Sequence, residues 1–271
     1  MKYMTFNSSC SYAGLANLLS CYGVDTEDRT IALEMKLPYL FAYEDGRYLS
    51  GPMLQTAQWF NLYLNPLGFT FVEHILGKDA VCAALQTHPP AMLGLHVTPK
   101  SKHAVIYTGS REGEYHFLNN KHHTSPEPET LCLTESGLLS RLDETVTIGA
   151  LKKTEPSPIN LRPYLERSLT TLRSLQAELI AFCSQEQSPA AQRQAMENLF
   201  RSILLDGVTM LELLEEEQLA SSLWTIRTQF MQAVRESQPA VLSSHLDMPL
   251  LTTAMTKYAQ LIAAEMETIC P

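Results

Sequence analysis

The distribution of glycine divides this chain into two parts. Eleven of its twelve glycines lie before residue 155, and only Gly207 lies after it. The change comes at Thr-Glu-Pro-Ser-Pro over 154–158, where two prolines in three residues can continue neither a helix nor a β-ladder. We therefore predict one domain over residues 1–154 and a second over 159–271. A chain of 271 residues is long enough to form two hydrophobic cores.

Apolar residues in the second part recur at spacings of three and four, which predicts amphipathic helices. Four such stretches are expected, over about 161–182, 188–204, 209–236 and 249–269. Their short connections favour an all-α antiparallel bundle of about four helices, with the apolar stripes packed in its core. The same stripes could support a homodimer. The three glutamates over 215–217 are expected to lie on a solvated helix face.

The first part mixes helical and strand-like patterns. Helices are expected over 11–22, 26–35 and 53–65. Strand-like runs follow over 69–75, 91–97, 103–109, 114–119 and 145–151. Helices followed by a small antiparallel sheet are typical of an α+β domain. The charged segment 43–52 is predicted to be a loop, at the border of a cleft or on the surface.

Composition and charge exclude several classes of function. The net charge of −9 argues against nucleic acid as a partner, because phosphate binding needs a basic surface. No apolar run is long enough to span a membrane, and the amino terminus does not resemble a signal peptide. The six cysteines are scattered without a C-x-x-C pair, which favours a reducing compartment. A cytoplasmic protein without a cofactor is therefore expected.

One cysteine lies at a position that favours reactivity. Cys10 follows Asn-Ser-Ser over 7–9, residues that favour helix caps, and precedes an apolar helix. Free N–H groups and the positive end of the helix dipole stabilise a thiolate at such a position. The same amides can donate to an oxyanion. A packed small residue is the alternative interpretation of this cysteine.

A base for this thiol is predicted at the start of a strand. His103 begins the strand-like run His-Ala-Val-Ile-Tyr-Thr-Gly, so its imidazole is expected at the rim of the sheet. Asn119 ends the next strand and could hold the second ring nitrogen, the orienting role in a catalytic triad. Asn120 would take this role if the strand register shifted by one residue.

These segments resemble a known family. The sequence C-S-Y-A-G-L-A-N-L-L-S-C-Y-G from Cys10 is similar to the start of the bacteriocin-leader-processing cysteine peptidase domains. The strand that begins at His103, and its spacing to Asn119, also resemble that family. The amino-terminal domain of the butirosin-biosynthesis acyltransferase is a similar relative. The resemblance covers residues 1 to about 150 and implies a papain-like domain, with Cys10, His103 and Asn119 as its catalytic residues.

The sequence departs from the family pattern at two positions. The peptidases carry a glutamine six residues before the cysteine, where this chain has Met4. Asn7, Ser11 and Asn120 are therefore candidates for oxyanion or substrate contacts. The family's third residue is an aspartate followed by proline, whereas this chain has Asn119 and Asn120.

Three functions follow from these residues. The first is a cysteine hydrolase, a peptidase or amidase that works through an acyl-enzyme on Cys10. The second is an acyltransferase that passes an acyl group from a thioester to an amine, and the third is a non-catalytic peptide-binding module. A carrier protein is a possible partner, because three lysines surround the histidine strand: Lys100, Lys102 and Lys121.

No metal site is expected. The metal-capable residues that follow the histidine strand match no common zinc spacing: His116, His122, His123 and Cys132.

Overall fold

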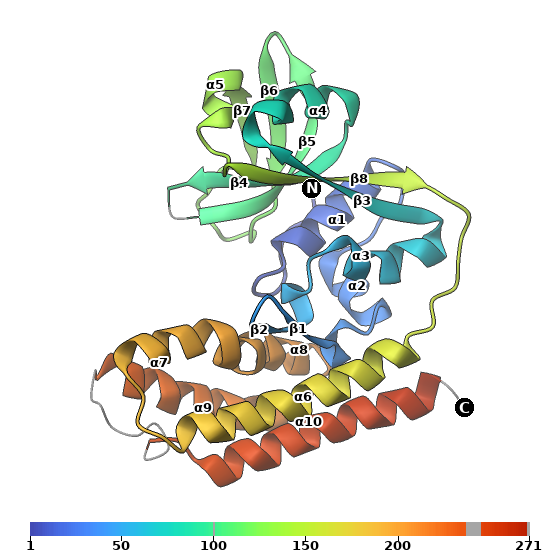
Figure 1. Ribbon diagram of the computed structural model, residues 1–271. Helices are drawn as coiled ribbons and strands as arrows, with labels where there is room; N and C mark the ends of the chain where they lie inside the picture. The colour runs from blue at the N-terminus through green and yellow to red at the C-terminus, as the bar shows by residue number, and fades with distance from the viewer. Residues whose placement is uncertain (100, 237–244, 270–271) are drawn as a thin grey trace. The chain divides into compact units, whose positions relative to one another are not determined.

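The structure is a computed structural model that describes residues 1–99, 101–236 and 245–269. It contains a six-stranded antiparallel sheet with helices packed on it, followed along the chain by a helical part. This confirms the predicted fold class (Figure 1). Within the described ranges, no helix combines the length and apolar character needed to cross a bilayer.

The chain forms two compact units, which differ from the predicted domains in one segment. Unit 1 consists of Met1–Met35 and Gln55–Ile159, and unit 2 of Lys36–Leu54 and Asn160–Pro271. Residues 36–54 were expected in the first domain, but they pack with the helices of unit 2.

The sheet of unit 1 has the strand order β3-β8-β4-β5-β6-β7. Its strands are β3 (Phe69–Gly77), β4 (Ala91–Thr98), β5 (Ser101–Arg111), β6 (Glu114–Asn119), β7 (Thr130–Thr134) and β8 (Thr145–Lys153). The sequence predicted five of them and missed β7, whose five residues give too short a run to stand out.

Five helices accompany the sheet. They are α1 (Cys10–Ser20), α2 (Asp28–Glu34), α3 (Ala57–Leu64), α4 (Val81–Thr87) and α5 (Glu135–Leu139). Helix α1 packs on β5 and β4, α3 on β3, and α4 on β5. A core cluster joins α4 and α5 to the sheet, and it includes Leu85, Leu93, Val105, Phe117 and Leu138. Neither α4 nor α5 was predicted, and α3 begins four residues later than expected.

The segment predicted as a loop over 43–52 contains most of a β-hairpin. Strands β1 (Phe41–Glu44) and β2 (Arg47–Ser50) pair antiparallel in unit 2. Asp45 and Gly46, with φ of +50° and +75°, form the two-residue turn that favours hairpins. The Asp-Gly pair is a strong hairpin signal in the sequence, so this prediction was wrong for a local reason.

Hydrogen bonds and ring contacts hold this hairpin on the helices of unit 2. The N–H of Phe41 donates to Oγ of Ser168 at 2.9 Å, and the rings of Phe41 and Tyr258 meet edge to face at 5.2 Å. The hydroxyl of Tyr48 donates to Glu178 at 2.6 Å. The hairpin is therefore an integral part of unit 2.

The helices of unit 2 differ from the predicted four in one place. They are α6 (Arg162–Cys183), α7 (Pro189–Ala195), α8 (Val208–Leu213), α9 (Glu217–Arg235) and α10 (Met248–Ile269). Two π-helical stretches, Met196–Phe200 and Ser202–Gly207, continue α7 into α8. The helix predicted over 209–236 is instead broken after Leu213, because Glu215 takes a left-handed φ of +64°. The three glutamates mark a helix break, with Glu215 and Glu217 exposed and Glu216 half-buried.

Candidate active site

The structure places Cys10 as the first residue of α1. Ser9 precedes the helix, but its side chain makes no capping bond to the first turn. Its one hydroxyl proton is instead shared between the carbonyl of Phe6 at 2.7 Å and Asp28 at 2.8 Å. The first amides of α1 are therefore not occupied by a side-chain cap and can stabilise negative charge on the sulfur or on a bound oxyanion.

A buried carboxylate holds the segment that leads to Cys10. Asp28 is 0% exposed and accepts hydrogen bonds from the N–H and hydroxyl of Thr5, the hydroxyl of Ser9 and the N–H of Arg29. All four bonds are 2.7–2.8 Å long. Because Asp28 lies at the start of α2, it ties the approach to the thiol to a second helix. The sequence predicted only a helix over 26–35 in this region.

Gln55 contacts residues on both sides of Cys10, the backbone of Ser8 and the side chain of Ser11. Its Nε2 donates to the carbonyl of Ser8 at 3.0 Å, and its Oε1 accepts from the hydroxyl of Ser11 at 3.1 Å. Ser8 has a left-handed φ of +57°, an uncommon conformation for a residue other than glycine. Gln55 lies more than forty residues away along the chain, so no local pattern in the sequence could have identified this role.

The imidazole of His103 is oriented by Asn119. Nδ1 of His103 lies 2.9 Å from Oδ1 of Asn119, whose Nδ2 donates to the carbonyl of Pro128 at 2.9 Å. The second bond fixes which end of the amide faces the histidine. Oδ1 therefore accepts, the ring proton lies on Nδ1, and Nε2 keeps its lone pair.

The other ring nitrogen has partners apart from the thiol. Nε2 of His103 lies 2.9 Å from Oγ of Ser101 and 3.5 Å from Oε2 of Glu127. Among the described residues, no hydrogen bond joins Sγ of Cys10 to either ring nitrogen. A thiol–imidazole bond therefore requires the ring to exchange Ser101 for Cys10, and such bonds often tighten only when substrate is bound.

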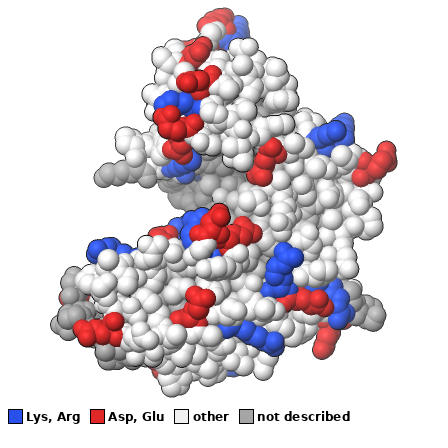
Figure 2. Space-filling view, viewed as in Figure 1, with Lys and Arg blue, Asp and Glu red and all other residues white. Residues whose placement is uncertain are grey.

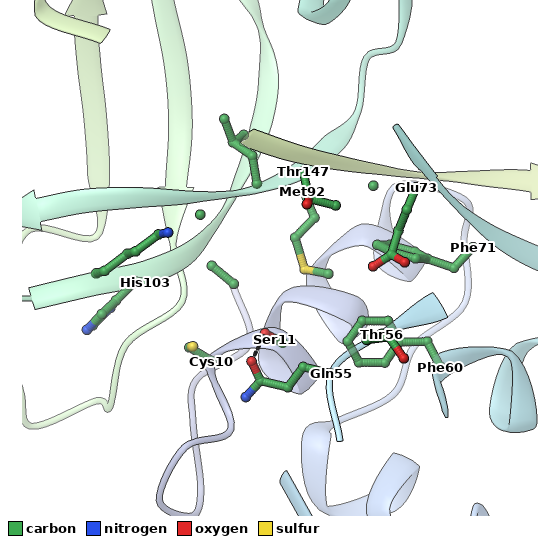
Figure 3. A pocket seen from close by; sticks show the side chains of 15 residues that line it. Cys10, Ser11, Gln55, Thr56, Phe60, Phe71, Glu73, Met92, His103 and Thr147 are labelled. Carbon is green, nitrogen blue, oxygen red and sulfur yellow. Dashed lines mark hydrogen bonds between the residues drawn. The ribbon is translucent and has the colours of Figure 1, made fainter. Parts of the chain in front are cut away.

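Cys10 and His103 line one cavity of about 450 Å³. Figure 3 shows the two side chains near one end of it and Glu73 at the other, with Met92 between them. Apolar walls come from Phe60, Phe71, Met92 and Leu93. The carboxylate of Glu73 accepts a hydrogen bond from the N–H of Ala57 at 3.1 Å. The cavity thus has a thiol and an imidazole near one end and a carboxylate at the other.

The other candidate contact residues have different positions. Ser11 lines the cavity, whereas Asn7 is exposed and Asn120 is fully buried, and neither of these two lines it. Asn120 donates to the carbonyl of Ala104 at 2.6 Å and accepts from Asn17 at 2.9 Å. Asn120 therefore joins α1 to the sheet, and Asn119 is the asparagine that contacts the histidine.

The described lysines near the histidine have partners within unit 1. Lys102 forms an ion pair with Asp143, and Lys121 is 5% exposed and donates to the carbonyl of Ser125 at 2.7 Å. Lys100 lies outside the described residues. Figure 2 shows that acidic and basic side chains alternate on the visible face and form no single basic surface there.

Burial distinguishes several cysteines from Cys10. It raises the pKa of Cys183 to about 12 and raises the pKa of Cys21 and Cys82. A raised thiol pKa leaves less thiolate at neutral pH, so these three sulfurs are poor nucleophiles. Cys270 lies outside the described residues.

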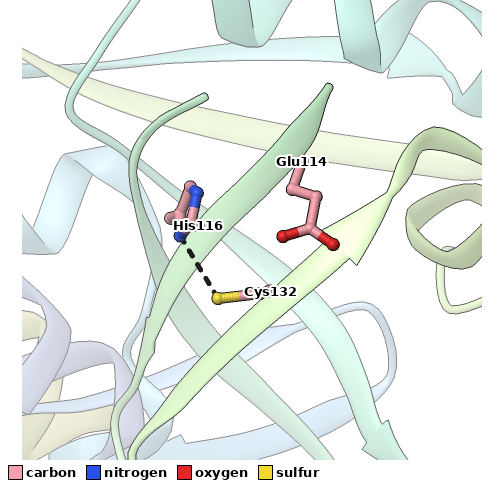
Figure 4. A group of neighbouring side chains, drawn as sticks. All are labelled: Glu114, His116 and Cys132. Carbon is pink, nitrogen blue, oxygen red and sulfur yellow. Dashed lines mark hydrogen bonds between the residues drawn. The ribbon is translucent and has the colours of Figure 1, made fainter. Parts of the chain in front are cut away.

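Another cysteine forms part of a cluster on strands β6 and β7. Glu114, His116 and Cys132 place their ligand atoms within 4.8 Å of one another, and Sγ of Cys132 lies 3.2 Å from Nδ1 of His116 (Figure 4). These donor types could hold a zinc-like cation. His122 and His123 are elsewhere, against Met4 and Tyr3.

No protein-family model and no curated protein matches this chain. Several solved structures are similar to part of it, and two of them are described here. One is the peptidase domain of Streptococcus ComA, a bifunctional ABC transporter of a quorum-sensing pathway, with 14% identity and a TM-score of 0.37. The other is a double-glycine-motif protease from an AMS/PCAT transporter in complex with the leader peptide, with 11% identity and a TM-score of 0.38.

The two alignments cover 55% and 56% of this chain, and 96% and 89% of the respective structures. At these identities and TM-scores, neither likeness carries an argument about function.

Proposed function

We propose that this chain is a papain-like cysteine hydrolase that cleaves an amide bond of a peptide. The observation that carries the proposal is the arrangement of three side chains. Cys10 lies at a helix start, His103 lines the same cavity, and Asn119 fixes the imidazole tautomer. This arrangement supports a thiol nucleophile and a base with a free lone pair on Nε2.

The reaction proceeds through an acyl-enzyme. Nε2 of His103 takes the proton of Cys10, and the thiolate attacks the substrate carbonyl. The first amides of α1 donate to the oxyanion, and Nε2–H protonates the leaving amine. A water molecule, deprotonated by the same nitrogen, then hydrolyses the thioester and restores the thiol.

Acyl transfer is the second candidate, and the position of Glu73 favours it. A carboxylate at the far end of a cavity with apolar walls suits a protonated amine, which could be a basic side chain of a peptide or an acceptor molecule. In acyl transfer a neutral amine replaces water in the second step and gives its proton to Nε2 of His103, and the apolar walls would limit competing hydrolysis.

The first test is alkylation by iodoacetamide across a range of pH, with each cysteine followed by peptide mass spectrometry. We expect Cys10 to react faster near neutral pH than Cys21, Cys82 and Cys183, whose raised pKa values suppress the thiolate. His103→Ala should return Cys10 to the pH profile of a free thiol. A profile already like that of a free thiol, and unchanged by the substitution, would refute the proposal.

Cys132 provides a matched control, because it also contacts a histidine but is exposed on the edge strand β7. His103→Ala should leave its reactivity unchanged. The two candidate functions are then separated by mass spectrometry after incubation with peptide and with acyl thioester. Hydrolysis of the peptide supports the hydrolase. An acyl adduct on Cys10 that is released only by amines supports the acyltransferase. A reactive thiol that forms neither product would leave peptide binding as the function.

A further inference from the structure

A buried carboxylate oxygen lies beside His103 without a hydrogen-bond partner. Oε2 of Glu127 is 3.5 Å from Nε2 of His103, and both side chains are less than a fifth exposed, at 17% and 18%. Among the described residues of unit 1, it is the one buried side-chain oxygen or nitrogen for which no hydrogen-bond partner is found. A buried, unpaired carboxylate oxygen is costly, so its position beside the proposed base calls for a physical reason.

The segment that carries Glu127 is held at several points. The N–H of Glu127 donates to Oγ of Ser125 at 3.3 Å, and Lys121 donates to the carbonyl of Ser125. The carbonyl of Pro128, the next residue, accepts from Asn119. These bonds keep the backbone of Glu127 near the imidazole, so the carboxylate is not placed there by a freely moving loop.

The imidazole faces few other charges. Of the titratable and charged groups that line its cavity, Cys10 comes from α1, Lys102 from β5 and Glu73 from β3. Lys102 is paired with Asp143, and Glu73 lies at the other end of the cavity in Figure 3. Asn119 contacts Nδ1 but carries no charge. Glu127 is therefore the negative group placed to act directly on Nε2.

We propose that Glu127 is a positioning residue that stabilises the imidazolium form of His103. This inference rests on the proposed function, in which His103 becomes cationic when Cys10 gives its proton to Nε2. An opposite charge at this distance favours the charged form of a histidine. Glu127 thus promotes the thiolate–imidazolium pair, while Asn119 sets the orientation of the ring. The proton moves from Sγ to Nε2, and Glu127 itself is not protonated.

The direct test follows the pH titration of the His103 ring by NMR in a Cys10→Ala background. Glu127→Gln keeps the size of the side chain and removes its charge, so the midpoint should move to lower pH. Glu129→Gln is the matched control, because that glutamate lies two residues away and accepts from the hydroxyl of Tyr3. It should leave the midpoint unchanged. An unchanged midpoint in Glu127→Gln would overturn the inference.

A second measurement separates this inference from the proposed function. In the chain with Cys10 present, Glu127→Gln should slow alkylation of Cys10 severalfold near neutral pH, and Glu127→Asp should restore part of the rate. If Cys10 behaves as a free thiol in the unaltered chain, the proposed function fails, whatever the NMR titration shows. If Cys10 is activated but neither readout responds to Glu127→Gln, only the role of Glu127 fails.

Discussion

Asn119 and Asn120 are neighbours in the sequence, but their side chains have different partners. One amide contacts His103 and the carbonyl of Pro128, and the other joins Asn17 to the carbonyl of Ala104. Asn119 is the last residue of β6, and Asn120 is the first residue after it. The adjacent pair therefore allows orientation of the base to be separated from stability.

We expect Asn119→Ala to lower the rate of Cys10-dependent turnover by about 100-fold, because a misplaced imidazole no longer meets the thiol. Asn120→Ala should instead lower the free energy of unfolding by about 1–3 kcal/mol, since it leaves buried partners unsatisfied. Urea denaturation and the rate measured below the unfolding transition distinguish the two. Equal loss of rate in both variants would contradict the division.

Asp28 gives a second residue-scale prediction. Asp28→Ala removes the acceptor of four hydrogen bonds in a fully buried position, so stability should fall by at least about 3 kcal/mol. The first amides of α1 would then no longer be aligned with the sulfur of Cys10. Alkylation of Cys10 should therefore slow even at temperatures where the variant stays folded. Denaturation curves and peptide mapping of the alkylated protein measure the two effects. A stable variant with unchanged reactivity would show that Asp28 does not set this alignment.

At the scale of single residues, local sequence patterns predict part of the candidate site. The capping residues before Cys10 and the strand that begins at His103 are visible in the sequence, and so is the spacing to Asn119. Gln55 and Glu127 are not, because their roles depend on contacts between segments distant in the chain or on burial created by folding. A glutamate in a polar segment has no sequence signal that distinguishes a buried oxygen from a solvated one.

At the scale of elements, the pairing of β3 with β8 shapes the cavity wall. Gly149 lies opposite Glu73 in this pairing, and the ring of Phe71 occupies the space that a side chain at Gly149 would take. Phe71 also meets Phe60 edge to face at 5.1 Å, so its ring has little room to move within the wall.

Gly149→Ala should therefore cost about 1–3 kcal/mol of stability, because the new methyl group displaces the Phe71 ring. The displaced ring should also weaken binding of any ligand that occupies the cavity. Gly77→Ala is a suitable control on β3, since nothing lies within 4 Å of the added carbon. Thermal unfolding of both variants measures the difference, and equal stability would contradict the expected clash.

There are physical reasons why some elements were not predicted from the sequence. The hairpin of β1 and β2 was hidden by charged and tyrosine residues that resemble a surface loop, although Asp45 and Gly46 mark its turn. The break after α8 depends on a left-handed glutamate, a conformation that no residue preference announces. Long periodic helices such as α6 and α10 were predicted within a few residues, because their apolar stripes extend over many turns.

At the scale of the whole molecule, the two units are interleaved along the chain. Residues 36–54 belong to unit 2, although they are flanked on both sides by segments of unit 1. Their buried apolar side chains include Leu37, Leu40, Phe41 and Tyr48. The predicted homodimer through the helices stays a prediction.

A fragment of residues 1–159 should therefore expose these apolar side chains, since it lacks the helices that cover them. We expect it to bind a hydrophobic dye and to self-associate in sedimentation or light scattering. The same fragment with residues 36–54 replaced by a flexible Gly-Ser linker should stay monomeric and keep its secondary structure. A monomeric, dye-free fragment that still contains 36–54 would show that the hairpin does not depend on the helices.

The interleaving also sets an order for folding during synthesis. The ribosome releases the hairpin early, but the helices that bury it begin at residue 162 and end near residue 269. All segments of unit 1 have emerged once residue 159 has left the exit tunnel, before the helices of unit 2 have followed. Cys10 and His103 can thus be brought together on the nascent chain before the helices cover Phe41 and its neighbours. Chaperone binding at this hairpin is therefore expected to be strongest in that interval.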